Sequence, residues 1–113
     1  MKKAYRVKKN SEFQAVIQSG KSFANREFVI YYKEKQDGNH FRVGISVGKK
    51  LGNAVTRNRL KRLIREAFRE LEQNISPKVD IIIIARQNSV GLPYERVKKS
   101  IYHLLKRLRL IHN

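Results

Sequence analysis

The feature that most restricts the fold of this chain is the uninterrupted apolar run at residues 80–85, Asp-Ile-Ile-Ile-Ile-Ala. A strand that faces water on one side alternates apolar and polar residues, and this run does not alternate. It therefore predicts a strand that is covered on both faces. Such a strand needs other elements packed on each side of its sheet, so the sequence favours a layered arrangement of helices and strands.

Two other segments have the period-two alternation of half-buried strands. They are residues 27–35, EFVIYYKEK, and residues 41–48, FRVGISVG. The polar residues 36–39, Gln-Asp-Gly-Asn, lie between them and have the composition of a turn. Two alternating segments joined by a short turn predict an antiparallel hairpin. Residues 21–26 are compatible with one additional short strand.

Three segments have the apolar spacing of amphipathic helices. The first begins near residue 10 and places Phe13, Val16 and Ile17 on one face. The second covers residues 53–73, and the third runs from Pro93 to about residue 110. The expected order is therefore α-β-β-α-β-α in a single α+β domain of residues 1–113. Residues 1–9 contain five cations and no acid, which predicts a partly ordered basic arm.

The second predicted helix and the loop before it carry an unusual density of positive charge. Residues 49–69 contain eight Lys or Arg and one acid, Glu66. With Leu60 at zero and 100° per residue, Ile64, Ala67, Phe68 and Leu71 lie between about −20° and 80°. Most of the cations lie between about 100° and 260°. Like charges on one rigid surface repel one another unless a polyanion lies beside them. The pattern therefore predicts nucleic acid as the partner.

The composition of the whole chain supports this class of partner and excludes others. Its 113 residues include 26 Lys or Arg and 9 Asp or Glu, a net charge of +17, which favours nucleic acid over an anionic membrane surface. No apolar run approaches the roughly 20 residues of a membrane span. The basic N-terminus is not followed by the apolar stretch of a signal peptide. We therefore expect a cytoplasmic protein without a membrane partner. Because the chain has no cysteine, disulfide-linked partners and thiolate metal sites are excluded.

The candidate nucleic-acid-binding residues belong to this helix and the loop before it. Guanidinium groups bind phosphate oxygens with a fork of donors, and an asparagine amide offers a donor and an acceptor together. Glycines at 48 and 52 would let the backbone approach a ligand closely, and Arg57 lies on the flank of the helix, near any adjoining cleft. The candidates are Lys49, Lys50, Arg57, Asn58, Arg59, Lys61, Arg62 and Arg65.

The sequence contains no recognisable catalytic or metal-binding constellation. His40, His103 and His112 are far apart, and the carboxylates form neither a DxD nor an ExxH pattern. Asp80 could contact a metal or cap a neighbouring element, and we prefer the capping role. We therefore expect no catalytic and no metal-ligating residue in this chain.

A second candidate surface is the sheet face that three helices leave incompletely covered. Tyr31 belongs to the strand face opposite Phe28 and Ile30, and an aromatic side chain there would stack unpaired nucleotides of any sequence. From the residues alone, burial in the core is the commoner role for such side chains.

The segment 46–68, SVGKKLGNAVTRNRLKRLIREAF, resembles the signature of the protein subunit of bacterial ribonuclease P. The likeness extends to VKKNSEFQAVIQSG, ANREFVIYY, FRVGISVGKK and DIIIIAR, and so to nearly the whole chain. It implies a ribosomal-protein-like α-β sandwich with a left-handed βαβ crossover. The general preference for right-handed crossovers does not predict that feature.

The resemblance also implies a function. In that family a large RNA is catalytic and uses Mg²⁺ to hydrolyse the bond that joins the 5′ leader to precursor tRNA. The helix containing the RNR triplet contacts the catalytic RNA, which gives this role to the candidates named above. The single-stranded leader lies in a cleft between the first helix, the sheet and the RNR helix, where Phe13, Ile17 and Tyr31 match family positions. Ile17 retains an apolar surface but lacks a ring for stacking.

Two other interpretations of the residues remain open. A ribosomal or other structural RNA-binding protein shares this composition. A nucleoid-type protein would instead place the basic helix in the major groove of DNA.

Overall fold

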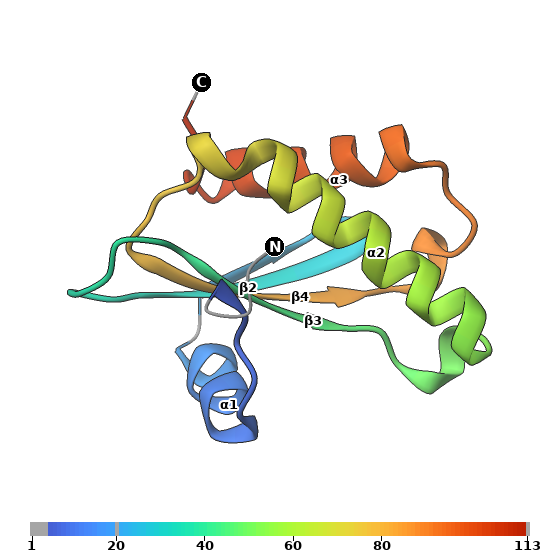
Figure 1. The fold of residues 1–113 in the computed structure, drawn as a ribbon, viewed down its shortest axis with the longest axis horizontal. Helices are drawn as coiled ribbons and strands as arrows, with labels where there is room; N and C mark the ends of the chain where they lie inside the picture. Colours follow the sequence, from blue (N-terminus) through green and yellow to red (C-terminus); the bar gives the residue numbers. More distant parts are fainter. Residues whose placement is uncertain (1–4, 20, 113) are drawn as a thin grey trace.

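The structure is a computed structural model that describes residues 5–19 and 21–112, and it contains one four-stranded sheet with helices on both faces (Figure 1). Short 3₁₀ turns at Lys49–Leu51, Glu72–Asn74 and Gln87–Ser89 accompany the main elements. The main elements are α1 (Asn10–Gln18), β1 (Lys21–Ala24), β2 (Phe28–Glu34), β3 (Arg42–Ser46), α2 (Ala54–Leu71), β4 (Val79–Ala85) and α3 (Tyr94–Arg107). The predicted order is confirmed, and β1 is the additional short strand.

The predicted hairpin of the second and third strands is wrong, because β4 lies between them. The order of strands across the sheet is β1-β2-β4-β3, and β4 is antiparallel to β2 and parallel to β3. A strand buried on both faces is favoured at the centre of a sheet, where both of its edges are also hydrogen-bonded. The connection from β3 through α2 to β4 is the implied βαβ crossover, and its left-handed sense stays a prediction.

The main hydrophobic core lies between the sheet and the pair of helices α2 and α3. Figure 1 shows these two helices together on one side of the sheet. Phe28 and Ile30 of β2 and Ile81 and Ile83 of β4 point to this side and are fully buried. The buried positions of the two helices are Leu60, Ile64, Ala67, Phe68, Leu71, Val97, Ile101, Leu104 and Leu105. They have the spacing that the sequence predicts.

On the opposite face of the sheet, α1 is the one helix among the described residues (Figure 1). Val16 of α1 packs there with Val7 and Ile82, and the partly buried neighbours include Phe13 and Tyr31. A nine-residue helix is too short to cover four strands, so this face keeps half-exposed apolar and aromatic side chains. The expected incompletely covered face is therefore present.

Asp80 connects α1 to the sheet through Arg42, and these ion pairs take the place of the capping role predicted for it. The Arg42 guanidinium donates to the Asp80 carboxylate at 2.7 and 3.1 Å and to Glu12 of α1 at 2.9 Å. Lys35 Nζ donates to Asp80 at 3.0 Å. Burial opposes ionisation of Asp80, but these hydrogen bonds outweigh it and hold the pKa of Asp80 below its usual value.

Within the described residues, no helix is both long enough and apolar enough to cross a membrane.

Candidate nucleic-acid interface

The start of α2 is fixed by the two residues that precede it. The Asn53 side chain accepts a hydrogen bond from the Thr56 backbone N–H at 2.9 Å and so caps the helix. Gly52 has a φ of 145°, a conformation that favours glycine. Gly48 has an ordinary φ of −68°, and a Cβ built on it would meet no atom within 4 Å. The fold therefore requires glycine at 52 but not at 48.

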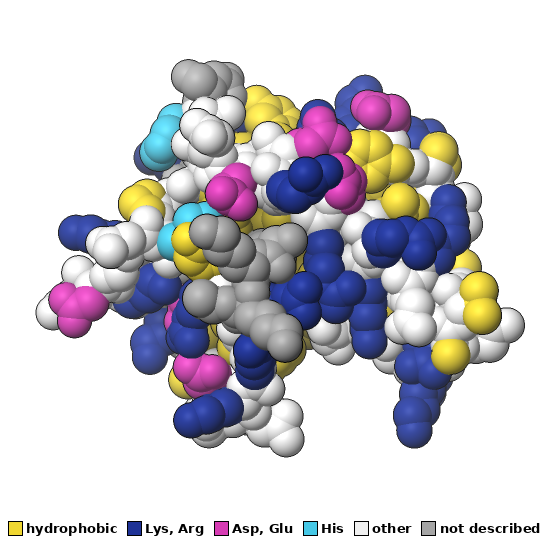
Figure 2. All heavy atoms as spheres, viewed as in Figure 1, with side chains coloured by type: hydrophobic (Ala, Val, Ile, Leu, Met, Phe, Trp, Pro, Cys, Tyr) yellow, Lys and Arg dark blue, Asp and Glu magenta, His cyan; other side chains and the backbone are white. Residues whose placement is uncertain are grey.

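The predicted cations of α2 and its loop remain on the surface. Arg57, Lys61 and Arg65 are half-buried, and the other five candidates, Lys49, Lys50, Asn58, Arg59 and Arg62, are exposed. Figure 2 shows dark blue side chains gathered over the N-terminal half of α2. Among residues 5–19 and 21–112, no carboxylate forms an ion pair with any of these cations. Their charge is therefore available to a polyanion.

Two of these arginines contact backbone oxygens. Arg57 Nε donates to the Gly52 carbonyl at 3.1 Å, and the Arg59 guanidinium approaches the Leu92 carbonyl at 3.5 Å. A carbonyl orients a guanidinium without neutralising it. Further along α2 the pattern changes, because Arg69 pairs with Glu66. We call residues 57–65 of α2 the RNR surface.

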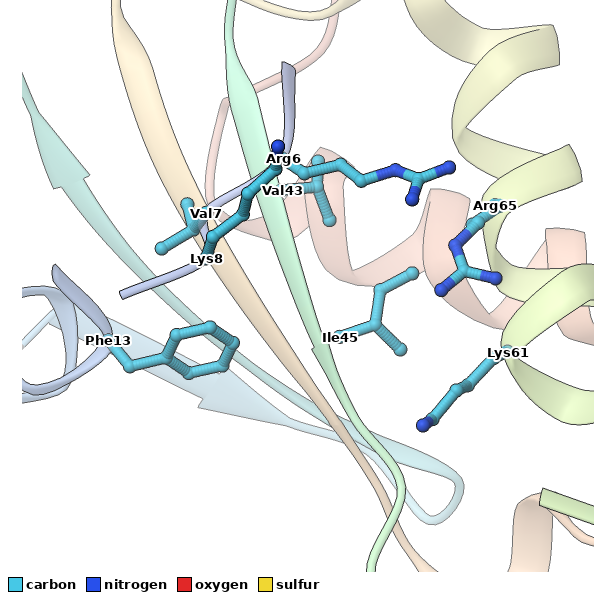
Figure 3. A pocket seen from close by; sticks show the side chains of 8 residues that line it. All are labelled: Arg6, Val7, Lys8, Phe13, Val43, Ile45, Lys61 and Arg65. Atoms are coloured by element: carbon cyan, nitrogen blue, oxygen red, sulfur yellow. The ribbon is translucent and has the colours of Figure 1, made fainter. Parts of the chain in front are cut away.

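A cleft of about 280 Å³ separates the RNR surface from α1 (Figure 3). The residues before α1 form one wall, since Arg6 bridges to Val43 of β3 and the Val7 N–H donates to the Val43 carbonyl at 3.1 Å. The lining residues are Arg6, Val7, Lys8, Phe13, Val43, Ile45, Lys61 and Arg65. Four cations thus surround a cleft that also contains an aromatic ring.

Positive charge is crowded in this cleft. Burial and the nearby charge of Arg6 lower the pKa of Arg65 from its usual value. The group remains a cation at neutral pH, because an arginine pKa starts far above 7. A bound anion would relieve this repulsion, so the cleft favours a ligand that combines negative charge with an apolar or aromatic surface.

The predicted leader-binding residues occupy different places. Phe13 lines the cleft. Tyr31 does not line it, but packs half-buried on the same sheet face in the cluster that includes Phe13. Ile17 is half-buried on α1 and is likewise absent from the lining.

The cations of the cleft also differ from the expectation. The lining residues of α2 are Lys61 and Arg65 rather than Arg57, whose side chain turns back to Gly52. Sequence reasoning did not assign Arg6 and Lys8 to the site. The five cations of residues 1–9 were the available signal, but nothing in the sequence places Arg6 and Lys8 beside α2.

The described residues contain no group of three or more His, Asp or Glu side chains that could hold a metal ion. The carboxylates of Glu12 and Asp80 are both held by Arg42.

The sequence is similar to that of a known protein family. The model of a family described as Ribonuclease P matches residues 1–109. The ribonuclease P protein component of Oceanobacillus iheyensis is 55% identical over 113 residues, which cover 100% of this chain and 93% of that protein. The Listeria welshimeri protein of the same name is 54% identical over 111 residues, covering 98% and 93%.

Solved structures show the same fold. The RNase P protein of Staphylococcus aureus is 46% identical with a TM-score of 0.89, covering 97% of this chain and 100% of that one. The RNase P protein of Thermotoga maritima is 32% identical with a TM-score of 0.82, covering 90% and 96%. By sequence and by fold, this chain belongs to the ribonuclease P protein family.

Proposed function

We propose that this chain is the protein subunit of ribonuclease P, the endonuclease that removes the 5′ leader from precursor tRNA. In this proposal the RNA subunit is catalytic, and the protein binds both that RNA and the leader. The observation that carries the proposal is the RNR surface, whose cations have no carboxylate partner among the described residues. It adjoins a cleft that combines four cations with Phe13.

The RNR surface would bind the catalytic RNA through its phosphates. Each phosphate that a fixed cation neutralises releases condensed counterions, so binding becomes favourable at low salt and weakens steeply as salt rises. Structured RNA is recognised mostly by its shape and backbone. A helix with preformed, unpaired cations matches that mode of recognition, because its charges need no rearrangement on binding.

The cleft and the sheet face beside it would hold the single-stranded leader. Cations such as Lys61 and Arg65 would contact its phosphates, while Phe13 and Tyr31 would stack against its bases. Holding the leader fixes the scissile phosphate relative to the active site of the RNA, which is a contribution to positioning. Mg²⁺, which we assign to the RNA, would supply the activated water for hydrolysis.

A cytoplasmic location belongs to the same proposal. The alternative, a ribosomal or other structural RNA-binding protein, accounts for the basic surface. It gives no specific role to a cationic cleft lined by an aromatic ring.

Reconstitution tests the proposal. The purified chain is combined with a ribonuclease P RNA transcript, and cleavage of precursor tRNA is measured at low and high Mg²⁺. The protein should restore site-specific cleavage at low Mg²⁺, and the protein alone should cleave nothing at the leader junction. Failure to restore activity, or specific cleavage by the protein without RNA, would contradict the proposal.

A further inference from the structure

A second basic surface lies on the outer side of α3, away from the core. At 100° per residue, Arg96, Lys99, His103, Lys106 and Arg107 fall within about 100° of the helix circumference. All five side chains are exposed. The buried residues of α3 lie on the other side, against the sheet and α2. We call this set the α3 surface.

The cations of the α3 surface exceed the carboxylates beside them and are not held in ion pairs. In the described part of the chain, none of its cations forms an ion pair, whereas Lys98 on the adjacent flank pairs with Glu70 at 3.0 Å. Arg107 lies over the Phe23 ring at 4.7 Å, which holds its side chain along the surface. Two acids border it: Glu27, which accepts a hydrogen bond from Ser100 at 2.9 Å, and Glu95 in the first turn of α3, beside Arg96.

The α3 surface is continuous with the RNR surface. On α2, Arg59 projects on the flank towards α3, and its guanidinium approaches the Leu92 carbonyl just before α3 begins. Leu92 also lines a groove of about 400 Å³, and three residues of the α3 surface, Arg96, Lys99 and His103, line the same groove. The groove is lined by Glu27, Leu92, Arg96, Lys99, Ser100 and His103. Basic side chains therefore run from α2 across Leu92 onto α3.

The two sides of the RNR surface point to different regions. Lys61 and Arg65 line the cleft beside α1, whereas Arg59 reaches the start of α3. Because α3 covers the sheet face opposite α1, a short strand held in the cleft does not reach the α3 surface. A large structured RNA bound to α2 can extend over it.

We propose that the α3 surface is a second phosphate-binding site for the catalytic RNA, an extension of the RNR surface across Leu92. This inference rests on the proposed function. From Arg96 to Lys106 the α3 surface spans about 15 Å along the helix axis. An RNA strand offers several phosphates over that length. Arg96 and Lys99 share the groove with Leu92, which Arg59 contacts. Of the α3 surface, these two cations would therefore be the first to meet RNA that is bound to Arg59.

The test compares two variants that remove the same charge. R96Q/K99Q removes two unpaired cations of the α3 surface. K21Q/K98Q removes two cations that are already paired with Glu34 and Glu70. Affinity for a ribonuclease P RNA transcript is measured between 50 and 200 mM salt, and affinity for a single-stranded leader oligonucleotide in parallel. Circular dichroism checks that both variants are folded.

R96Q/K99Q should weaken binding of the transcript roughly tenfold at the upper salt concentration and reduce the salt slope by about 1.5. K21Q/K98Q should change the affinity less than about twofold, since exposed ion pairs contribute little free charge. Leader binding should be unchanged in both. Equal effects of the two variants, an unchanged slope in R96Q/K99Q, or an equal loss of leader binding would overturn the inference.

A third variant, R57Q/R62Q, separates this inference from the proposed function. If R57Q/R62Q weakens transcript binding and R96Q/K99Q does not, only the role of the α3 surface is wrong. If neither variant changes transcript binding, the proposed function of α2 fails as well.

Discussion

Phe13 and Gly44 are in direct contact, since a Cβ built on Gly44 would lie 2.6 Å from Cζ of Phe13 and 2.7 Å from Cδ1 of Ile82. The missing side chain lets the aromatic ring of α1 lie against the backbone of β3. The wall of the cleft that carries Phe13 is therefore set by one glycine in the sheet.

Replacing Gly44 by alanine should destabilise the protein and displace α1. The added methyl group overlaps Phe13 and Ile82, and overpacking of this kind costs about 1–3 kcal/mol in the free energy of unfolding. Urea denaturation measures this loss. Affinity for a leader oligonucleotide should also fall, because the ring moves. A G44A protein as stable as the wild type would show that α1 does not pack as described.

Gly48 provides the contrasting prediction. Its φ is ordinary and a Cβ there meets nothing within 4 Å, so G48A should leave the free energy of unfolding unchanged within about 0.5 kcal/mol. If RNA backbone approaches this loop closely, the same change should weaken binding of the catalytic RNA. A stable G48A protein with unchanged RNA affinity would remove Gly48 from the interface.

The network around Arg42 predicts loss of stability in acid. The hydrogen bond from Arg42 is the main cause that lowers the pKa of Glu12, and hydrogen bonds from Arg42 and Lys35 keep the pKa of Asp80 low despite burial. A carboxyl group with a lowered folded-state pKa stabilises the fold above its unfolded pKa. That stability should therefore be lost progressively below about pH 4.

The variant D80N tests this network. It should lower the free energy of unfolding at pH 7 by about 3 kcal/mol, because Arg42 and Lys35 lose the charged carboxylate that they share, and it should reduce the loss in acid. D37N, at an exposed turn residue, is the matched control and should behave like the wild type. An identical acid transition in D80N and the wild type would mean that Asp80 does not contribute.

Tyr31 should matter for the leader and not for mature tRNA. The Y31A substitution removes one stacking surface. A stacked base contributes roughly 1–3 kcal/mol of binding free energy, so affinity for the leader should fall about 5- to 150-fold. Y31F retains the ring and should bind nearly as well as the wild type. Affinities of the reconstituted enzyme for precursor and mature tRNA provide the readout. Equal losses on both RNAs would exclude a leader contact at Tyr31.

Local sequence patterns predicted the helices and strands but not which strands pair in the sheet. The alternation in β2 and β3 and the turn at residues 36–39 are real, yet the two strands are not paired. Pairing depends on where β4 inserts, and β4 follows β3 in the chain only after the whole of α2. Its four isoleucines indicated burial on both faces, and that property accounts for its central position.

For the candidate site, helical periodicity was the reliable guide. The separation of Leu60 and Ile64 from Arg62 and Arg65 follows from helix geometry alone, and the structure keeps it. The contribution of Arg6 to the cleft was not predictable, because the residues before α1 have no periodicity. Their position depends on a backbone contact with Val43 at the edge of the sheet.

The salt dependence of RNA binding by the RNR surface tests the central claim most directly. R57Q/R59Q/R62Q removes three cations without carboxylate partners, and K21Q/R69Q/K98Q removes three that are paired. The first variant should reduce the slope of log affinity against log salt by about 2 to 3 for the catalytic RNA, and the second by less than about 1. Equal slopes for the first variant and the wild type would contradict the claim that fixed, unpaired cations of α2 bind RNA phosphates.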